Sequence, residues 1–185
     1  MTKLLGPTLG SVLMPVVRSR GFTLIELMVT IAVLAILVAI GYPSFQGVLR
    51  SNRVAAANNE LIALLNLSRS EAIRNGQGGG ICGSSNGSSC DGNWSGGVMA
   101  WSDTNGNGGF DAGETVLRYS TGNPSLVVQG PTSGTVIAFD ARGRRRAAAD
   151  QQVILRPDQC GSQPLRRSLT VNASGQIRSK KEACV

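Results

Sequence analysis

The side chains available for acid–base or nucleophilic chemistry are limited in this sequence of 185 residues, because it contains no histidine. Without histidine the chain lacks the commonest general base and metal ligand, and it lacks the Ser-His and Cys-His nucleophile pairs. A Ser-Lys or two-carboxylate mechanism would be required instead, and no motif in the sequence supports either. The composition therefore argues against an enzyme.

Four cysteines can form two disulfides if the chain reaches an oxidising compartment. Cys82 and Cys90 are eight positions apart in a Gly-rich stretch, where a local disulfide is expected. Zinc is the alternative, but two cysteines without histidine supply too few ligands. Cys160 and Cys184 could close a loop with 23 residues between them, which the chain-entropy model values at ~3 kcal/mol.

A run of Asp, Asn and Gly residues fits D-x-[DN]-x-[DN]-G-x5-E, the pattern of calcium-binding loops. Its Gly108 would make the tight turn, and its oxygen ligands would be Asp103, Asn105, Asn107, Asp111 and Glu114. At most three of these ligands, Asp103, Asp111 and Glu114, are charged, so affinity would be weak. Strand-like segments also replace the flanking helices of an EF-hand. A hairpin turn rich in Asp, Asn and Gly is the structural alternative. No other cofactor is expected.

Basic residues gather at the carboxyl-terminal end of a chain whose formal net charge is +7. Residues 140–185 contribute +6, whereas residues 22–139 contribute −2. Arginine clusters favour phosphate groups through bidentate hydrogen bonds and counterion release. A solvated loop, or a surface facing an acidic neighbour, is the alternative, and the absence of interleaved aromatic residues gives no support for base stacking. The basic residues of this end are Arg142, Arg144, Arg145, Arg146, Arg156, Arg166, Arg167, Arg178, Lys180 and Lys181.

Ahead of these groups lies an apolar segment from Phe22 to Tyr42, 21 residues long, whose one charged residue is Glu26. A helix of that length spans ~30 Å, the thickness of a bilayer's hydrocarbon core. The residues before it are basic without any acid, which places that end in the cytoplasm and the rest outside. A secretory signal peptide and a plain anchor are alternatives, but neither explains Glu26, since a carboxylate there costs roughly 3 kcal/mol.

The amphipathic pattern after Tyr42 extends the helix to residue 75, with a kink expected near Pro43 and a C-cap at Asn75-Gly76. Residues 22–75 therefore divide into a transmembrane part, 22–42, and an amphipathic stalk, 43–75. Residues 76–113 are Gly-rich and can form only short strands. Strand signals then follow at Thr115–Ser120, Ser125–Gln129, Thr135–Asp140, Gln151–Arg156 and Ser168–Asn172. The sequence predicts an α+β protein with a β-rich globular domain at 76–185.

The segment Ser19-Arg20-Gly21-Phe22-Thr23-Leu24-Ile25-Glu26-Leu27 resembles the type III signal of type IV pilins and type II secretion pseudopilins. The resemblance implies that residues 1–21 are a leader, that a prepilin peptidase cuts between Gly21 and Phe22, and that Phe22 is N-methylated. It also implies that Glu26 pairs with the terminal amine of a neighbouring subunit. The leader is longer than usual, so Met14 is an alternative start to Met1.

Two further stretches resemble the GspH/FimT family. One is the loop at 103–114 with the tryptophan before it, which in that family we interpret as a β-turn feature. The other is Val136–Gly143. The resemblance implies a pilin-like fold, with the long helix packed on an antiparallel β-sheet domain. It also implies a minor pilin or pseudopilin of a type II secretion pseudopilus or type IV pilus, with the filament tip as its expected place. Its partners would be other subunits, the prepilin peptidase and the assembly platform of a bacterial inner membrane, with the carboxyl-terminal domain periplasmic.

DNA-uptake pilins of the FimT type carry a Gly-Arg-x-Arg motif, and DNA binding in natural transformation is therefore the alternative function. The matching position here is Gly175-Gln176-Ile177-Arg178, in which the first arginine is replaced by glutamine. Gly143-Arg144-Arg145-Arg146 also fits the motif, but at a different place in the chain. The candidate DNA contacts that the resemblance implies are Arg178, Lys180 and Lys181 and, at the second place, Arg144, Arg145 and Arg146.

The cleavage assignment predicts the behaviour of Gly21→Ala. This variant should remain in the inner membrane as the uncleaved precursor, because the residue before the cut is changed. Immunoblotting of membrane fractions, with mass spectrometry of the amino terminus, measures the result. Normal processing of the variant would contradict the assignment.

Overall fold

The structure is a computed structural model that describes residues 21–132, 135–161 and 163–184. The predicted leader therefore lies outside the described residues up to position 20, as do both candidate start methionines. The chain divides into two compact units between Gly41 and Tyr42, and each unit is described by itself.

Helix α1 spans Leu24–Asn75 and continues through Pro43. It begins two residues later than predicted because Thr23 is its cap: the backbone N–H of Glu26 donates to the Thr23 hydroxyl oxygen at 3.2 Å. At the other end, the side-chain oxygen of Asn75 accepts the N–H groups of Gln77 and Gly78 at 2.8 and 3.1 Å. Gly76 has a φ of 68°, so the predicted Asn-Gly stop signal is confirmed.

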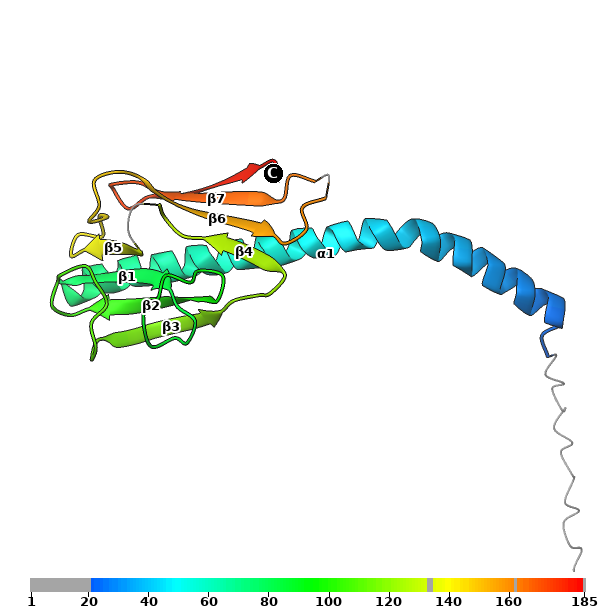
Figure 1. The fold of residues 1–185 in the computed structure, drawn as a ribbon, viewed down its shortest axis with the longest axis horizontal. Coiled ribbons are helices and arrows are strands. Elements are labelled where there is room, and N and C mark those ends of the chain that lie inside the picture. Colours follow the sequence, from blue (N-terminus) through cyan, green and yellow to red (C-terminus); the bar gives the residue numbers. More distant parts are fainter. Residues whose placement is uncertain (1–20, 133–134, 162, 185) are drawn as a thin grey trace, which may run out of the picture. The chain divides into compact units, whose positions relative to one another are not determined.

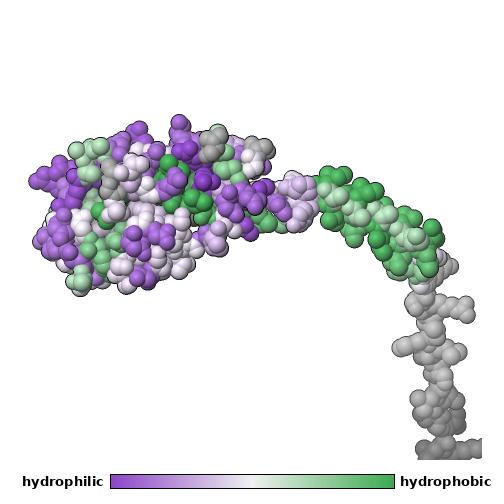
Figure 2. Space-filling model, in the orientation of Figure 1, coloured by the Kyte–Doolittle hydropathy of each residue, from purple (hydrophilic) through white to green (hydrophobic). Residues whose placement is uncertain are grey.

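The first part of α1 carries its apolar side chains on the surface. Every residue from Leu24 to Gly41 is exposed, and Figure 2 shows this part of the helix as almost uniformly hydrophobic. By length and composition the helix could cross a membrane. Such a surface is costly in water and suits a lipid or protein environment.

Strands of the described part of the chain form two antiparallel four-stranded sheets that accompany the later part of α1 (Figure 1). The first sheet has the order β3-β2-β1-β5 and is made of β1 (Gly78–Gly83), β2 (Gly97–Asp103), β3 (Thr115–Thr121) and β5 (Val136–Asp140). The second has the order β4-β6-β7-β8 and is made of β4 (Leu126–Gln129), β6 (Gln151–Pro157), β7 (Arg166–Val171) and β8 (Ile177–Glu182).

The five strands predicted after Glu114 are confirmed to within two residues at each end. Strand β8 was not predicted, because Ile177–Glu182 is nearly all polar. Its register with β7, from Val171↔Ile177 to Arg166↔Glu182, shows that pairing rather than apolar alternation makes it a strand. Strand β1 was not predicted either, because its sequence opens with three glycines.

One apolar core joins the helix to both sheets. The helix contributes the buried face predicted from its spacing, including Val54, Leu61, Leu64, Leu65 and Ala72. The first sheet adds Ile81, Ile137 and Phe139, and the second adds Leu126, Val153, Leu155, Leu169 and Val171. Because both sheets share one core with α1, the helix cannot leave without exposing the interior of the unit.

The glycines of β1 allow the strand to lie directly against the helix. A Cβ on Gly79 would lie 2.6 Å from the carbonyl oxygen of Ser68 in α1 and 3.2 Å from that of Trp101 in β2. A Cβ on Gly80 would lie 2.6 Å from the Trp101 ring. Glycine in a strand interior marks such a close approach of two backbones.

A short turn before β2 connects the two sheets. The hydroxyl of Ser95 donates to the carbonyl oxygen of Val128 in β4 and accepts the Val128 N–H, both at 3.0 Å. Beside it the Trp94 ring fills the space left by Gly83 and Gly130, where an added Cβ would lie 2.7 and 2.1 Å from ring atoms. The N–H and carbonyl groups of Val128, on the edge of β4, therefore have hydrogen-bond partners inside the molecule.

The close approach at β1 predicts the effect of Gly79→Ala. The added methyl group meets backbone atoms on both sides, so we expect a loss of about 1–3 kcal/mol in the free energy of unfolding. Gly109→Ala is the matched control, since its Cβ would meet an ordinary contact at 3.5 Å. Urea unfolding of the detergent-solubilised protein, followed by tryptophan fluorescence, measures both. Equal stability of the two variants would contradict the packing described here.

Candidate functional site

The predicted processing site lies at the start of α1. Phe22 precedes the helix and is 85% exposed, and Glu26 is an exposed residue of the first helical turn. Thr23 and Glu26 have the spacing of a capping box, and an acidic residue in this position is favoured by the helix dipole. Glu26 thus lies in the first turn with its carboxylate on the surface.

All four cysteines are paired in the structure. A disulfide joins Cys82 to Cys90, with Cα atoms 5.7 Å apart, and a second joins Cys160 to Cys184 at 5.4 Å. The first closes the Gly-rich loop after β1, where Cys82 is fully buried beside Met99 and Trp101. The second ties the loop after β6 to the end of the chain after β8. Both pairs are structural links, the first between a strand and a loop and the second between two segments outside the strands.

The loop proposed for calcium begins at Asp103, which is fully buried at the end of β2. One carboxylate oxygen accepts the N–H of Gly106 at 2.6 Å, and the other accepts the N–H of Gly108 at 2.8 Å. The Arg146 guanidinium lies 3.6 Å from the same carboxylate. The Asp103 carboxylate therefore holds the backbone of its own loop in place.

The remaining oxygens of the loop also accept hydrogen bonds from within it. Glu114 accepts the N–H groups of Thr104 and Asp111 at 2.8 and 3.0 Å. Asp111 accepts the side-chain amides of Asn105 and Asn107 at 2.7 and 2.6 Å. Within the described ranges no group of three or more His, Cys, Asp or Glu residues is placed to hold a metal ion. The arrangement corresponds to the hairpin-turn alternative.

A buried carboxylate at the end of α1 was missed by the sequence reasoning. Glu71 accepts hydrogen bonds from Arg74 at 2.7 and 2.8 Å and from the Ser102 hydroxyl at 3.0 Å. The Arg74 bonds, with that of Ser102, hold the pKa of Glu71 below its usual range against the opposing effect of burial. Its position on the buried stripe of α1, three residues before an arginine, was the available signal.

The three consecutive arginines of the first basic motif have separate internal partners. Arg144 forms an ion pair with Asp140 at 3.1 Å, and Arg146 contacts Asp103. Arg145 is only 5% exposed; its guanidinium donates to the carbonyl oxygens of Asn172 and Ala149, and burial lowers its pKa. This motif is thus largely used in holding the fold.

The second basic motif lies on β8, the edge strand of its sheet. The Ser179 hydroxyl donates to Asn58 of α1 at 2.8 Å, so the alternating residues Arg178 and Lys180 face away from the helix. Both are exposed, as is Lys181 on the helix-facing side. Arg178 donates to Gln176, and Lys180 lies 3.7 Å from Glu182.

The structure brings the two basic motifs together, although they are more than thirty residues apart in sequence. The turn between β7 and β8 packs on residues 143–146: the N–H of Arg145 donates to Ala173 at 3.1 Å. A Cβ on Gly175 would lie 2.2 Å from the carbonyl oxygen of Gly143. One end of the second sheet therefore carries a surface to which both motifs contribute.

Known structures share this architecture. Two crystal structures of the type IV minor pilin FimU of Pseudomonas aeruginosa superpose with TM-scores of 0.51 and 0.52, at 20% and 19% identity. They cover 68% and 72% of this chain and 91% and 96% of FimU. Together with a match to the prokaryotic N-terminal methylation motif over residues 17–42, this fold defines a pilin-like protein.

The family follows from a longer match. Residues 57–175, more than half of the chain, match the family described as type II transport protein GspH. The chain belongs to this family. A curated relative, prepilin peptidase-dependent protein D of Escherichia coli, is 64% identical over 33 residues, which are 18% of this chain and 23% of that protein. The match to that relative thus covers less than a quarter of its length.

The buried loop carboxylate predicts a difference between two aspartates. Asp103→Ala leaves two backbone N–H groups and Arg146 without their acceptor, so we expect a loss of roughly 1–3 kcal/mol in the free energy of unfolding. Asp111→Ala, the control, removes an exposed acceptor and should cost much less. Chemical denaturation measures both. Isothermal titration with calcium completes the test, because saturable heat lost in both variants would show a metal loop instead.

Proposed function

We propose that this protein is a minor pilin or pseudopilin subunit that is cleaved after Gly21, N-methylated on Phe22 and built into a filament, at or near its tip. The observation that carries the proposal is the exposed apolar part of α1, which holds one acid, Glu26, four residues after the proposed new terminus. The match to the N-terminal methylation motif supports the same processing.

The physical role of Glu26 follows from its surroundings. In lipid or in the core of a filament, an isolated carboxylate and an isolated terminal ammonium are both costly, and pairing them offsets much of that cost. A subunit already in the filament can therefore offer its carboxylate to the amine of the next subunit. This pairing would set the register between subunits.

The rest of the chain suits a mechanical role. Before assembly, the apolar part of α1 would anchor the protein in a bacterial inner membrane, with residues 43–185 in the periplasm, where disulfides form. The prepilin peptidase, other pilin subunits and the assembly platform would be its partners. The disulfides and the shared core hold the β-domain as a rigid body on the stalk. We propose no catalytic activity.

DNA capture is a second candidate on the same scaffold. It is favoured by Arg178 and Lys180, which project from one face of the free edge strand beside the residues of the other basic motif. Side chains spaced along a strand can contact successive phosphates without reading bases. Arg144, Arg145 and Arg146 contribute less, since their guanidiniums have internal partners.

Deletion of the gene tests which machine uses the protein. Loss of protein secretion with normal twitching and transformation supports a secretion pseudopilus, whereas the opposite pattern supports a type IV pilus. Wild-type levels of all three would contradict the proposed function. Complementation with Glu26→Gln, which keeps the shape but not the charge of the side chain, tests the assembly role: processing should continue while assembly fails.

The basic edge predicts a measurable change in DNA binding. Replacing Arg178 and Lys180 with Ala should weaken binding of the full-length protein to a duplex at low salt and reduce the slope of log affinity against log salt by about two. Arg53→Ala with Arg118→Ala removes the same charge elsewhere and should bind like wild type. A gel shift at several salt concentrations measures this. Equal retardation by both double variants would exclude a site on β8.

A further inference from the structure

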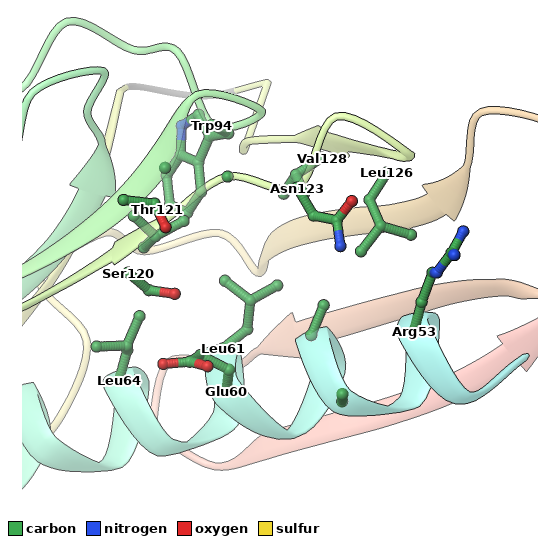
Figure 3. Close-up of a pocket in the computed structure, with 15 residues that line it drawn as sticks. Arg53, Glu60, Leu61, Leu64, Trp94, Ser120, Thr121, Asn123, Leu126 and Val128 are labelled. Carbon is green, nitrogen blue, oxygen red and sulfur yellow. The ribbon is translucent and has the colours of Figure 1, made fainter. Parts of the chain in front are cut away.

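A groove of about 280 Å³ lies between the two sheets, beside α1 (Figure 3). Leu61 and Leu64 of the helix form its floor. Facing them are Trp94 of the turn before β2, Val98 of β2 and Leu126 of β4. The open rim carries polar side chains from the end of β3 and the following turn, among them Thr121 and Asn123. We refer to this space as the Arg53 groove, after the cation at one end.

The charges along the groove are not balanced. Glu60 lines it but is already paired with Arg118, at 2.9 Å. Arg53, two helical turns earlier, makes no hydrogen bond or ion pair with another described residue. A neighbouring cavity of about 330 Å³ shares Arg53 and also contains Arg50 and one acid, Asp158. The groove therefore has an apolar floor and one uncompensated positive charge.

The backbone around the groove limits how it can be filled. Ser95 satisfies both the N–H and the carbonyl of Val128, and the N–H of Leu126 donates to Asn123 at 2.9 Å. An incoming strand would find these groups of β4 already bonded. An occupant must therefore use side chains, an apolar one for the floor and an acidic one for Arg53.

A second copy of this chain is poorly suited to supply both groups. Within the described ranges, every large apolar side chain that is clearly exposed is either Phe22, just before α1, or lies on α1 up to Ile73. Beyond the apolar segment, the acids of that helix are Glu60 and Glu71, and both are already paired with arginines. Beyond the apolar segment, the helix of a second copy therefore offers no unpaired carboxylate beside its exposed apolar side chains.

We infer that the Arg53 groove receives a bulky apolar side chain of a different pilin-like subunit, with an Asp or Glu nearby on that subunit paired to Arg53. The inference rests on the proposed function, because it takes the occupant to be another subunit of the filament. A buried apolar anchor beside a charged pair is the usual composition of a binding hot spot. The contact would fix which subunit is placed next to this one.

The test is photo-crosslinking of the full-length protein in its native cells. Thr121→p-benzoylphenylalanine places the reactive group on the exposed rim of the groove, and Gln152→p-benzoylphenylalanine places it on the outer face of the second sheet as a control. Each is combined with Arg53→Glu, Arg53→Lys or Arg156→Glu. Arg156→Glu is a matched charge reversal away from the groove.

We expect an adduct from position 121 whose partner has a prepilin-type amino terminus in mass spectrometry and whose linked residue lies near an Asp or Glu. Arg53→Glu should reduce this adduct at least tenfold, while Arg53→Lys and Arg156→Glu should change it less than twofold. No adduct, an adduct of this chain with itself, a partner of another kind, or equal loss with Arg156→Glu would overturn the inference. The deletion phenotypes and the Glu26→Gln result would still stand in those cases, so the two proposals fail separately.

Discussion

The contact between β1 and α1 is the constraint on which the rest of the globular unit depends. The absent side chain of Gly79 lets the strand backbone reach the helix backbone at Ser68. Strands β2 and β5 pair with β1 on either side, so the position of the whole first sheet is set by this approach. The second sheet is then joined through the shared core and through the bond between Ser95 and Val128. A larger residue at one position would disturb every layer.

Polar groups at the end of α1 complete this arrangement. Asn75 ends the helix and also donates to Gly78 and to the Ser102 hydroxyl, at 2.7 and 2.9 Å. Glu71 accepts from the same hydroxyl, and the next residue of β2, Asp103, organises the loop that follows. The helix end, two strands and a loop thus share one hydrogen-bonded network. Its groups are mostly buried, which makes each of them costly to remove.

Much of the fold could be predicted from local patterns. The apolar spacing of α1 identified its buried face, and alternation with turn residues identified the strands after Glu114. Strands β1 and β8 could not be found in this way, because one is a strand through close helix contact and the other through pairing with β7. The candidate site was harder to predict, because a sequence motif does not show which of its side chains are free to bind a partner. Arg145 and Asp103 fit binding patterns, yet burial and internal hydrogen bonds occupy them.

Strand β8 also has a consequence for solubility. It leaves one side of the second sheet open, and an open strand edge can pair with the edge of another molecule. This risk is greatest when many copies are held close together, as on a membrane surface. Charged side chains, lysine above all, are a common protection against such pairing, and Arg178, Lys180 and Lys181 supply three on this strand. Charges in these positions disfavour edge-to-edge pairing between neighbouring copies.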